Sequence, residues 1–188
     1  MPAAASGPSV LPAAVLFDMD GLLIDTEPLW FSVETEILTE LGAPWDYSDH
    51  ASLVGSSLKV ASAFVAERAG NGVTAADVAQ QLLLRMRARL RHTPVLQPGV
   101  VDLIDELDAA GVPRALVSSS FRVLVEAALE GLAPLTFDTT VVGDEVSVAK
   151  PHPEPYLLGA AKLGVDPSLC VALEDSPGGA ASASAAGC

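Results

Sequence analysis

Apolar residues along the chain follow two spacings that alternate. Four short, mostly apolar runs have the length and composition of strands buried on both faces of a sheet; they lie at 15–17, 115–117, 140–142 and 170–173. Helical spacing is found between and after these runs, at 100–110, 121–130, 154–163 and, in a stretch rich in small residues, at 177–188. Strands that alternate with helices predict a parallel sheet covered on both faces, with right-handed crossovers.

A long stretch after the first apolar run breaks this alternation. Its apolar positions keep helical spacing throughout, and they predict helices at 29–41, 59–69 and 75–91. The polar stretch 44–52 is expected to be a loop. We interpret the whole stretch as an all-helical cap domain inserted into an α/β core. The expected division is a flexible N-terminal tail at 1–12, a discontinuous, Rossmann-like core at 13–27 and 98–188, and the cap at 28–97.

Composition narrows the possible partners. The formal net charge of −14 over 188 residues argues against nucleic acid and anionic membranes, because both attract Lys and Arg. Two cysteines, Cys170 and Cys188, form no C-x-x-C pattern and suit a reducing compartment. The sequence has no secretory signal and no apolar run that could span a bilayer, so we expect a cytoplasmic protein. The oligomeric state is not given by the sequence, and a monomer is the default expectation.

Two acids stand directly after the first apolar run. Asp18 follows Phe17, and Asp20 comes two residues later. In an extended chain, positions i and i+2 point the same way, so both carboxylates are expected to face one spot. Gly21 then lets the backbone turn tightly. Two buried acids are costly without a positive group between them, and Mg²⁺, bound through oxygen ligands, is the expected cofactor.

The stretch 15–28, V-L-F-D-M-D-G-L-L-I-D-T-E-P, resembles motif I of the haloacid dehalogenase (HAD) superfamily, in the D-x-D-G form of its phosphatases and phosphomutases. The resemblance implies that Asp18 is the nucleophile, which becomes an aspartyl phosphate, and that Asp20 is the general acid/base. It also implies that Asp18 and the backbone carbonyl of Asp20 bind the metal. A carboxylate nucleophile splits phosphate hydrolysis into two steps through a covalent intermediate.

Three further strand ends carry polar groups, and the carboxyl ends of parallel strands share one edge of a sheet. These groups are Ser118, Lys150, which stands in a short loop after the third strand, and the pair Glu174 and Asp175. In chain order they resemble HAD motifs II, III and IV. The resemblance implies that Ser118 holds a phosphoryl oxygen, that Lys150 neutralises the phosphoryl group, and that Asp175 binds Mg²⁺ with Glu174 in support. Backbone N–H groups near Ser119 are expected to be further phosphate donors.

Substrate contacts are expected from the cap. Trp30 lies where the chain leaves the core, and Gly55 and Ser56 lie in a cap loop. Beta-phosphoglucomutases resemble this chain overall, but they carry His in the stretch of Trp30 and Arg shortly after the G-x-S of the loop. Both departures favour a phosphatase. The runs D-G-L-L-I-D-T-E-P-L-W and A-K-P-H-P-E-P-Y most resemble bacterial sugar-phosphate phosphatases, such as 2-deoxyglucose-6-phosphate and hexitol-phosphate phosphatases.

The predicted function is therefore a Mg²⁺-dependent phosphatase of small phosphorylated metabolites, with sugar phosphates as the expected substrates. A phosphosugar mutase is the first alternative. A signalling receiver domain also combines acids, Ser or Thr, Lys and Mg²⁺ on a parallel sheet, but the paired acids and the helical insertion argue against it. Members of the family usually continue past the equivalent of Cys188 into another strand and helix. A truncated, inactive fragment, with the strand at 170–173 as an exposed apolar edge, is thus a further alternative.

Overall fold

The structure is a computed structural model that describes residues 11–70 and 72–188. Four parallel strands form one sheet in the order β3-β2-β1-β4. They are β1 (Ala14–Phe17), β2 (Arg114–Val117), β3 (Thr139–Val141) and β4 (Cys170–Leu173). The predicted parallel sheet is confirmed, and every strand end lies within one residue of its predicted position. Most of the predicted N-terminal tail lies outside the described residues.

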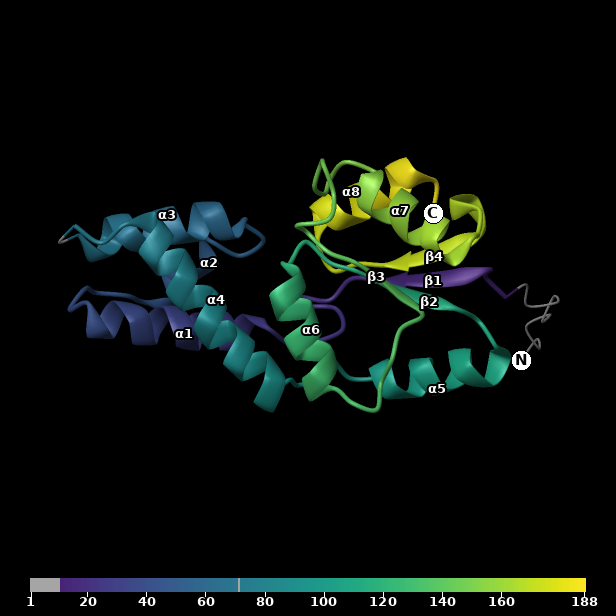
Figure 1. The fold of residues 1–188 in the computed structure, drawn as a ribbon, viewed down its shortest axis with the longest axis horizontal. Helices are drawn as coiled ribbons and strands as arrows, with labels where there is room; N and C mark the ends of the chain where they lie inside the picture. Colours follow the sequence, from purple (N-terminus) through teal and green to yellow (C-terminus); the bar gives the residue numbers. More distant parts are fainter. Residues whose placement is uncertain (1–10, 71) are drawn as a thin grey trace, which may run out of the picture.

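Helices cover both faces of the sheet, because successive side chains of a strand point to opposite sides. Ala14 and Leu16 of β1 pack toward one helix pair, and Val15 and Phe17 pack toward the other (Figure 1). The first pair is α7 (Glu154–Leu163) and α8 (Pro177–Ala186); the second is α5 (Val100–Ala110) and α6 (Arg122–Gly131). The apolar character of the strands on both sides is therefore explained by burial on both sides.

Strand β1 lies where the order of the strands reverses. From β1 the chain proceeds to β2 and β3 on one side, and β4 pairs with the other side. Open α/β sheets bind ligands at the carboxyl ends of the strands beside such a point. Phe17 is in register with Leu116 of β2 and with Leu173 of β4, so the residues after these strands emerge at similar levels. Within the described sheet β4 is an edge strand, and its Val171 is 44% exposed, as expected for an apolar edge.

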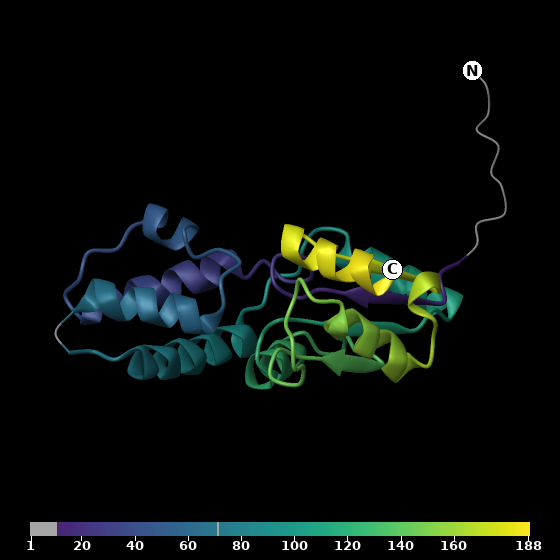
Figure 2. The same cartoon turned by 90° about the horizontal axis from the view of Figure 1, so that it is seen from above.

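Of the five described helices between β1 and β2, the first four lie together beside the sheet (Figure 1, Figure 2). They are α1 (Glu27–Glu40), α2 (Tyr47–Ala51), α3 (Leu58–Ala69) and α4 (Ala75–His92). Helix α4 packs against α1 and α3, and it also packs against α6 of the core. This arrangement agrees with an inserted cap, whose boundaries at 28 and 97 remain predictions. Among the described helices, none is both long and apolar enough to cross a membrane.

Two linkers join the helical segment to the core, and they lie side by side. Ile24 and Leu96 form an antiparallel bridge. The backbone N–H of Asp25 donates to the carbonyl of Val95 at 2.9 Å. The entry and the exit of the helical segment are thus held together, directly after the turn that follows Asp20.

The prediction of a loop throughout 44–52 is wrong, because this stretch contains α2. The Asp46 carboxylate accepts from the backbone N–H of Ser48 at 2.8 Å and of Asp49 at 3.1 Å. The Asp49 carboxylate accepts in turn from the backbone N–H of Asp46 at 3.3 Å. Such a capping box begins a helix through polar contacts. With only five residues, α2 is too short to show the apolar repeat from which a helix is recognised in a sequence.

Candidate active site

Asp18 lies at the carboxyl end of β1, in the interior of the protein. It is 7% exposed, and its backbone N–H donates to the carbonyl of Leu173 at 3.0 Å, which continues the pairing with β4. Burial raises the pKa of the Asp18 carboxyl to about 7, and the ammonium of Lys150 opposes this shift. The carboxylate form of Asp18 therefore depends on the positive groups around it.

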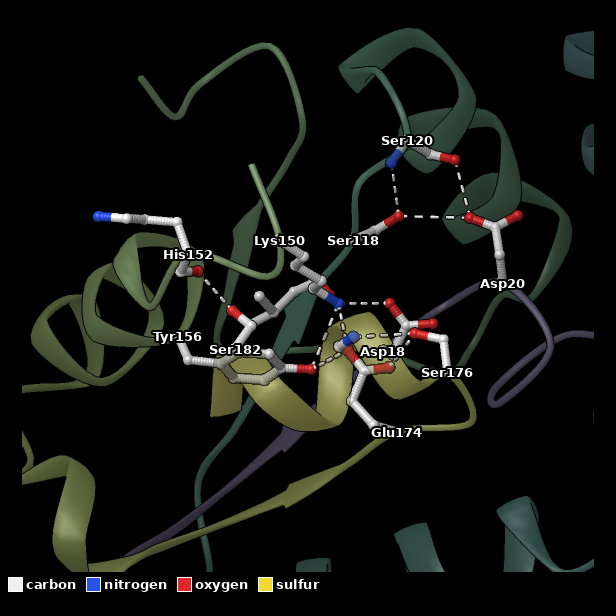
Figure 3. Close-up of polar contacts among 12 residues, drawn as sticks. Asp18, Asp20, Ser118, Ser120, Lys150, His152, Tyr156, Glu174, Ser176 and Ser182 are labelled. Atoms are coloured by element: carbon white, nitrogen blue, oxygen red, sulfur yellow. Dashed lines mark hydrogen bonds and ion pairs between the residues drawn. The ribbon is translucent and has the colours of Figure 1, made fainter. Parts of the chain in front are cut away.

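Lys150 provides positive charge from the loop between β3 and α7. Its Nζ donates to Asp18 Oδ1 at 2.7 Å, to Glu174 Oε1 at 2.5 Å and to the carbonyl of Val117 at 2.8 Å (Figure 3). An ammonium group has three hydrogens, which these three acceptors can use fully, and the hydroxyl oxygen of Tyr156 lies at a longer 3.3 Å from Nζ. Lys150 thus connects the carboxyl ends of β1, β2 and β4, and its side chain is only 7% exposed.

Glu174, directly after β4, is held by several donors. Its Oε1 also accepts from the hydroxyl of Tyr156, and its Oε2 accepts from Ser176 Oγ at 3.2 Å. The carboxylate lies against the first turn of α8, where a Cβ on Gly179 would come within 2.0 Å of it. Negative charge is favourable at the N-terminus of a helix. This arrangement makes Glu174 a positioning group for Lys150.

Asp20 has partners different from those of Asp18. Its Oδ2 accepts from Ser120 Oγ at 2.8 Å and from Ser118 Oγ at 3.4 Å, and Figure 3 shows this group apart from Lys150. The expectation that both carboxylates face one spot assumes that the chain stays extended through Asp20. Strand β1 ends at Phe17, so this assumption does not hold. Among the described residues, Asp20 Oδ1 is buried without a hydrogen-bond partner. A buried polar atom of this kind is available to a ligand.

Three carboxylates lie close enough together to hold one ion. Oxygen atoms of Asp18, Glu174 and Asp175 lie within 4.8 Å of one another. Asp175 comes so close to Gly21 that a Cβ there would lie 2.1 Å from its Oδ2. Burial also raises the pKa of the Asp175 carboxyl. With Lys150 as their cationic neighbour, these acids carry excess negative charge, and an all-oxygen set of this kind fits Mg²⁺.

The three residues predicted to contact substrate lie outside this cluster. Trp30 is half-buried in the first turn of α1, whereas Gly55 and Ser56 are exposed in the loop between α2 and α3. Within residues 11–70 and 72–188, no hydrogen bond joins any of the three to Asp18 or Lys150. Their role in binding substrate stays a prediction.

Two residues of the cluster were not predicted from the sequence. Ser120 contacts Asp20, and its backbone N–H donates to Ser118 Oγ at 2.9 Å. Ser119 is exposed, and the role of the backbone N–H groups near it stays a prediction. Tyr156 is fully buried beneath the sheet, with its hydroxyl on Glu174. Residues 118–120 are three consecutive serines, so the sequence does not indicate which of them contacts Asp20. Tyr156 could have been found from its place in A-K-P-H-P-E-P-Y, on the first turn of the helix that follows Lys150.

Comparison with known proteins agrees with this geometry. Residues 12–187 match the family model of a haloacid dehalogenase-like hydrolase. Hexitol phosphatase B of Escherichia coli K12 is 36% identical over 178 residues, which are 92% of this chain and 79% of that protein. The phosphorylated carbohydrates phosphatase of Thermotoga maritima is 32% identical over 187 residues, which are 93% of this chain and 81% of that protein.

Solved structures show the same fold. CbbY from Rhodobacter sphaeroides, in complex with phosphate, matches with a TM-score of 0.81 and 31% identity over 94% of this chain and 84% of that one. The family predicted from the four strand-end motifs is thereby confirmed. The chain belongs to the haloacid dehalogenase-like hydrolases, a family of enzymes.

Proposed function

We propose that this protein is a Mg²⁺-dependent phosphatase that hydrolyses small phosphorylated metabolites through an aspartyl phosphate on Asp18. The observation that carries the proposal is the contact of Lys150 with both Asp18 and Glu174, next to an Asp20 that has one oxygen without a hydrogen-bond partner in the described part of the chain. Two-step phosphate hydrolysis needs a nucleophile, a cation for the phosphoryl charge and a group that moves a proton. These residues supply all three at one edge of the sheet.

Sugar phosphates are the substrate class that we propose. The names of two relatives support this choice, since one is a hexitol phosphatase and the other a phosphatase of phosphorylated carbohydrates. The helical segment would close over the strand ends, exclude bulk water and select the substrate. Trp30, Gly55 and Ser56 are the residues that we expect to meet the sugar.

In the first step, an oxygen of Asp18 attacks phosphorus, and the bond from phosphorus to the leaving oxygen breaks. Asp20 gives a proton to that oxygen as it leaves. Lys150 faces the negative charge of the phosphoryl group. The Ser118 hydroxyl and the backbone N–H groups near Ser119 bind its remaining oxygens.

In the second step, water attacks phosphorus, and the bond to the Asp18 oxygen breaks, which releases inorganic phosphate. Asp20 takes a proton from the water as it attacks, so the side chain returns to its protonated form for the next turnover. Glu174 keeps Lys150 in place through both steps by means of its own contacts with Tyr156 and α8.

The residues that would hold Mg²⁺ are Asp18, Asp175 and Glu174, together with the backbone carbonyl of Asp20. When bound, the ion offsets the repulsion between the acidic site and the anionic substrate. The positive charge of Lys150 alone leaves this cluster with more acids than bases, which is why we expect activity to require the metal.

The proposal is tested by measuring phosphate release from a panel of sugar phosphates and other phosphometabolites. We expect the wild type to be active with Mg²⁺ and inactive with EDTA. Asp18→Asn is expected to lose at least about 10³-fold in rate, because an amide cannot replace the carboxylate nucleophile. Asp105→Asn, an exposed acid on α5, is the matched control and should keep full activity.

Equal rates for the wild type and Asp18→Asn would refute the proposed nucleophile. Conversion of one hexose phosphate isomer into another, faster than phosphate is released, would show a mutase instead.

A further inference from the structure

A buried histidine lies between two glutamates in the helical segment. His50 of α2 is 3% exposed; its Nδ1 lies 2.7 Å from Glu34 Oε2, and its Nε2 lies 3.0 Å from Glu27 Oε2. Glu34 is likewise 3% exposed, whereas the Glu27 side chain is 43% exposed. Both ring nitrogens therefore have a carboxylate partner on α1. None of the three residues takes part in the chemistry proposed above.

These contacts help to fix the position of α2 against α1. A helix of five residues is too short to be stable by itself, so its position comes from its anchors. His50 anchors α2 to α1, and Asp49 anchors it to α3 through an ion pair with Arg68. The two neighbouring residues of α2 thus hold the helix from two sides.

The loop between α2 and α3, residues 52–57, begins directly on His50. The backbone N–H of Leu53 donates to the carbonyl of His50 at 2.8 Å, and that of Ser56 donates to the carbonyl of Leu53 at 2.8 Å. These backbone hydrogen bonds connect His50, the residue that carries the buried imidazole, to the loop that contains the exposed Gly55 and Ser56. The loop lies on the side of the helical segment that is nearest the core (Figure 1, Figure 2).

Glu27, the second carboxylate partner of His50, lies where the chain enters the helical segment. Glu27 begins α1, immediately after the linker in which Asp25 pairs with Val95, and Trp30 follows one turn later. His50 consequently connects the 52–57 loop to the segment that joins the cap to the core.

The buried Glu34 carboxyl of this cluster needs a reason other than stability. Burial raises the pKa of Glu34, and His50 opposes that shift, so the glutamate pays a desolvation penalty that an apolar side chain would avoid. Replacement of buried ionic groups by apolar residues of similar volume is often neutral or stabilising. What directional hydrogen bonds provide is a fixed relative position of the elements that they join.

We propose that His50 is a positioning residue that fixes the 52–57 loop against α1 and thereby sets the affinity of the enzyme for the sugar part of its substrate. This inference rests on the proposed phosphatase function. It identifies a specificity device built from α1 and α2, separate from the phosphoryl-transfer residues of the core.

The test compares two substrates of different size in four proteins. The substrates are sorbitol 6-phosphate, which carries a polyol chain, and p-nitrophenyl phosphate, which lacks such a chain. The proteins are the wild type, His50→Gln, Glu27→Gln and Arg85→Gln. Arg85 is the matched control, because its ion pair with Glu40 also joins helices of this segment but lies outside α2.

We expect His50→Gln to raise the KM for sorbitol 6-phosphate about tenfold, with kcat nearly unchanged and with p-nitrophenyl phosphate unaffected. Glu27→Gln should change KM in the same direction by a few-fold, since its partly exposed carboxylate is one of two partners. Amide hydrogen exchange should be faster in residues 52–57 of His50→Gln, and Arg85→Gln should match the wild type in all these measurements.

The inference is overturned if both variants keep the wild-type KM, or if both substrates and Arg85→Gln are affected alike, because that pattern means general loosening. Should His50→Gln not fold, Glu27→Gln decides the question. A wild type without phosphatase activity would refute the proposed function instead, and the exchange measurement would still show whether His50 holds the loop.

Discussion

The core and the helical segment each bury one basic side chain between two carboxylates. In the core, Lys150 lies between Asp18 and Glu174; in the helical segment, His50 lies between Glu27 and Glu34. The two clusters differ in the polar groups that surround them. The Lys150 cluster has a further acid, Asp175, within 4.8 Å of its carboxylates, and Asp20 nearby has a buried oxygen without a hydrogen-bond partner among the described residues.

The His50 cluster, by contrast, is complete. Both ring nitrogens have partners, and no buried side-chain oxygen or nitrogen of these three residues is unpaired in the described structure. Unsatisfied polar groups and uncompensated charge mark a place where a ligand can still bind, whereas a satisfied cluster fixes a structure. This difference separates the proposed site of chemistry from the proposed positioning device.

The largest effect of a single substitution is expected at Lys150, the cation of the core cluster. Lys150→Met leaves Asp18 and Glu174 facing each other without a cation, and we expect the free energy of unfolding to fall by about 3–5 kcal/mol together with loss of activity. Lys162→Met removes a more exposed ion pair with Glu145 and should cost less than about 1 kcal/mol. Urea unfolding of both variants measures the difference.

An equal, small loss of stability in the two lysine variants would show that the Lys150 contacts do not compensate buried charge. In that case the contrast with His50 would lose its basis.

Metal ions should affect the core cluster alone. At a concentration of 100 times its dissociation constant, Mg²⁺ should raise the free energy of unfolding by about 2.7 kcal/mol, and Asp175→Asn should abolish most of this gain. His50→Gln should keep it in full. Thermal denaturation with and without MgCl₂ measures the effect, and an unchanged gain in Asp175→Asn would contradict the proposed ligand set.

The stabilisation by Mg²⁺ should also depend on pH. The pKa of Asp18 rises from its ordinary 3.8 to about 7 in the metal-free folded protein, so the folded state binds more protons than the unfolded state between these values. The contribution of Asp18 to stability is complete below the lower pKa and is lost as the pH rises through about 7. Because Mg²⁺ competes with this proton, its stabilising effect should be larger at pH 8 than at pH 6. An effect independent of pH would contradict binding through Asp18.

The smallest effect is expected at Tyr156. Tyr156→Phe removes one donor from Glu174 and a 3.3 Å acceptor of Lys150, but it keeps the other three acceptors of Lys150, so we expect a loss of about 1–2 kcal/mol in stability and a few-fold lower kcat. Tyr47→Phe on α2, where the side chain is 66% exposed, is the control and should change neither. Matching results for the two variants would show that Glu174 needs no support from Tyr156.

The candidate site was largely predictable because of where its residues stand in the chain. Asp18, Ser118 and Glu174 each come directly after a short apolar run, and parallel strands bring such positions to one edge. To apply this rule, one needs only the positions of the strands and their order in the sheet. The rule does not predict that Ser120, and not Ser119, contacts Asp20, because that choice depends on how the chain turns after β2.

The sequence alone determined the elements with a strong local pattern: the four strands, the long helices, the acids and serine at the strand ends, and the lysine in the loop after β3. Only the tertiary structure decided which distant side chains meet, such as Tyr156 with Glu174 and His50 with the glutamates of α1. The physical reason is that periodicity and capping act between near neighbours in the chain. The partners of a buried charge are instead set by packing between elements, which leaves no regular trace in the order of the residues.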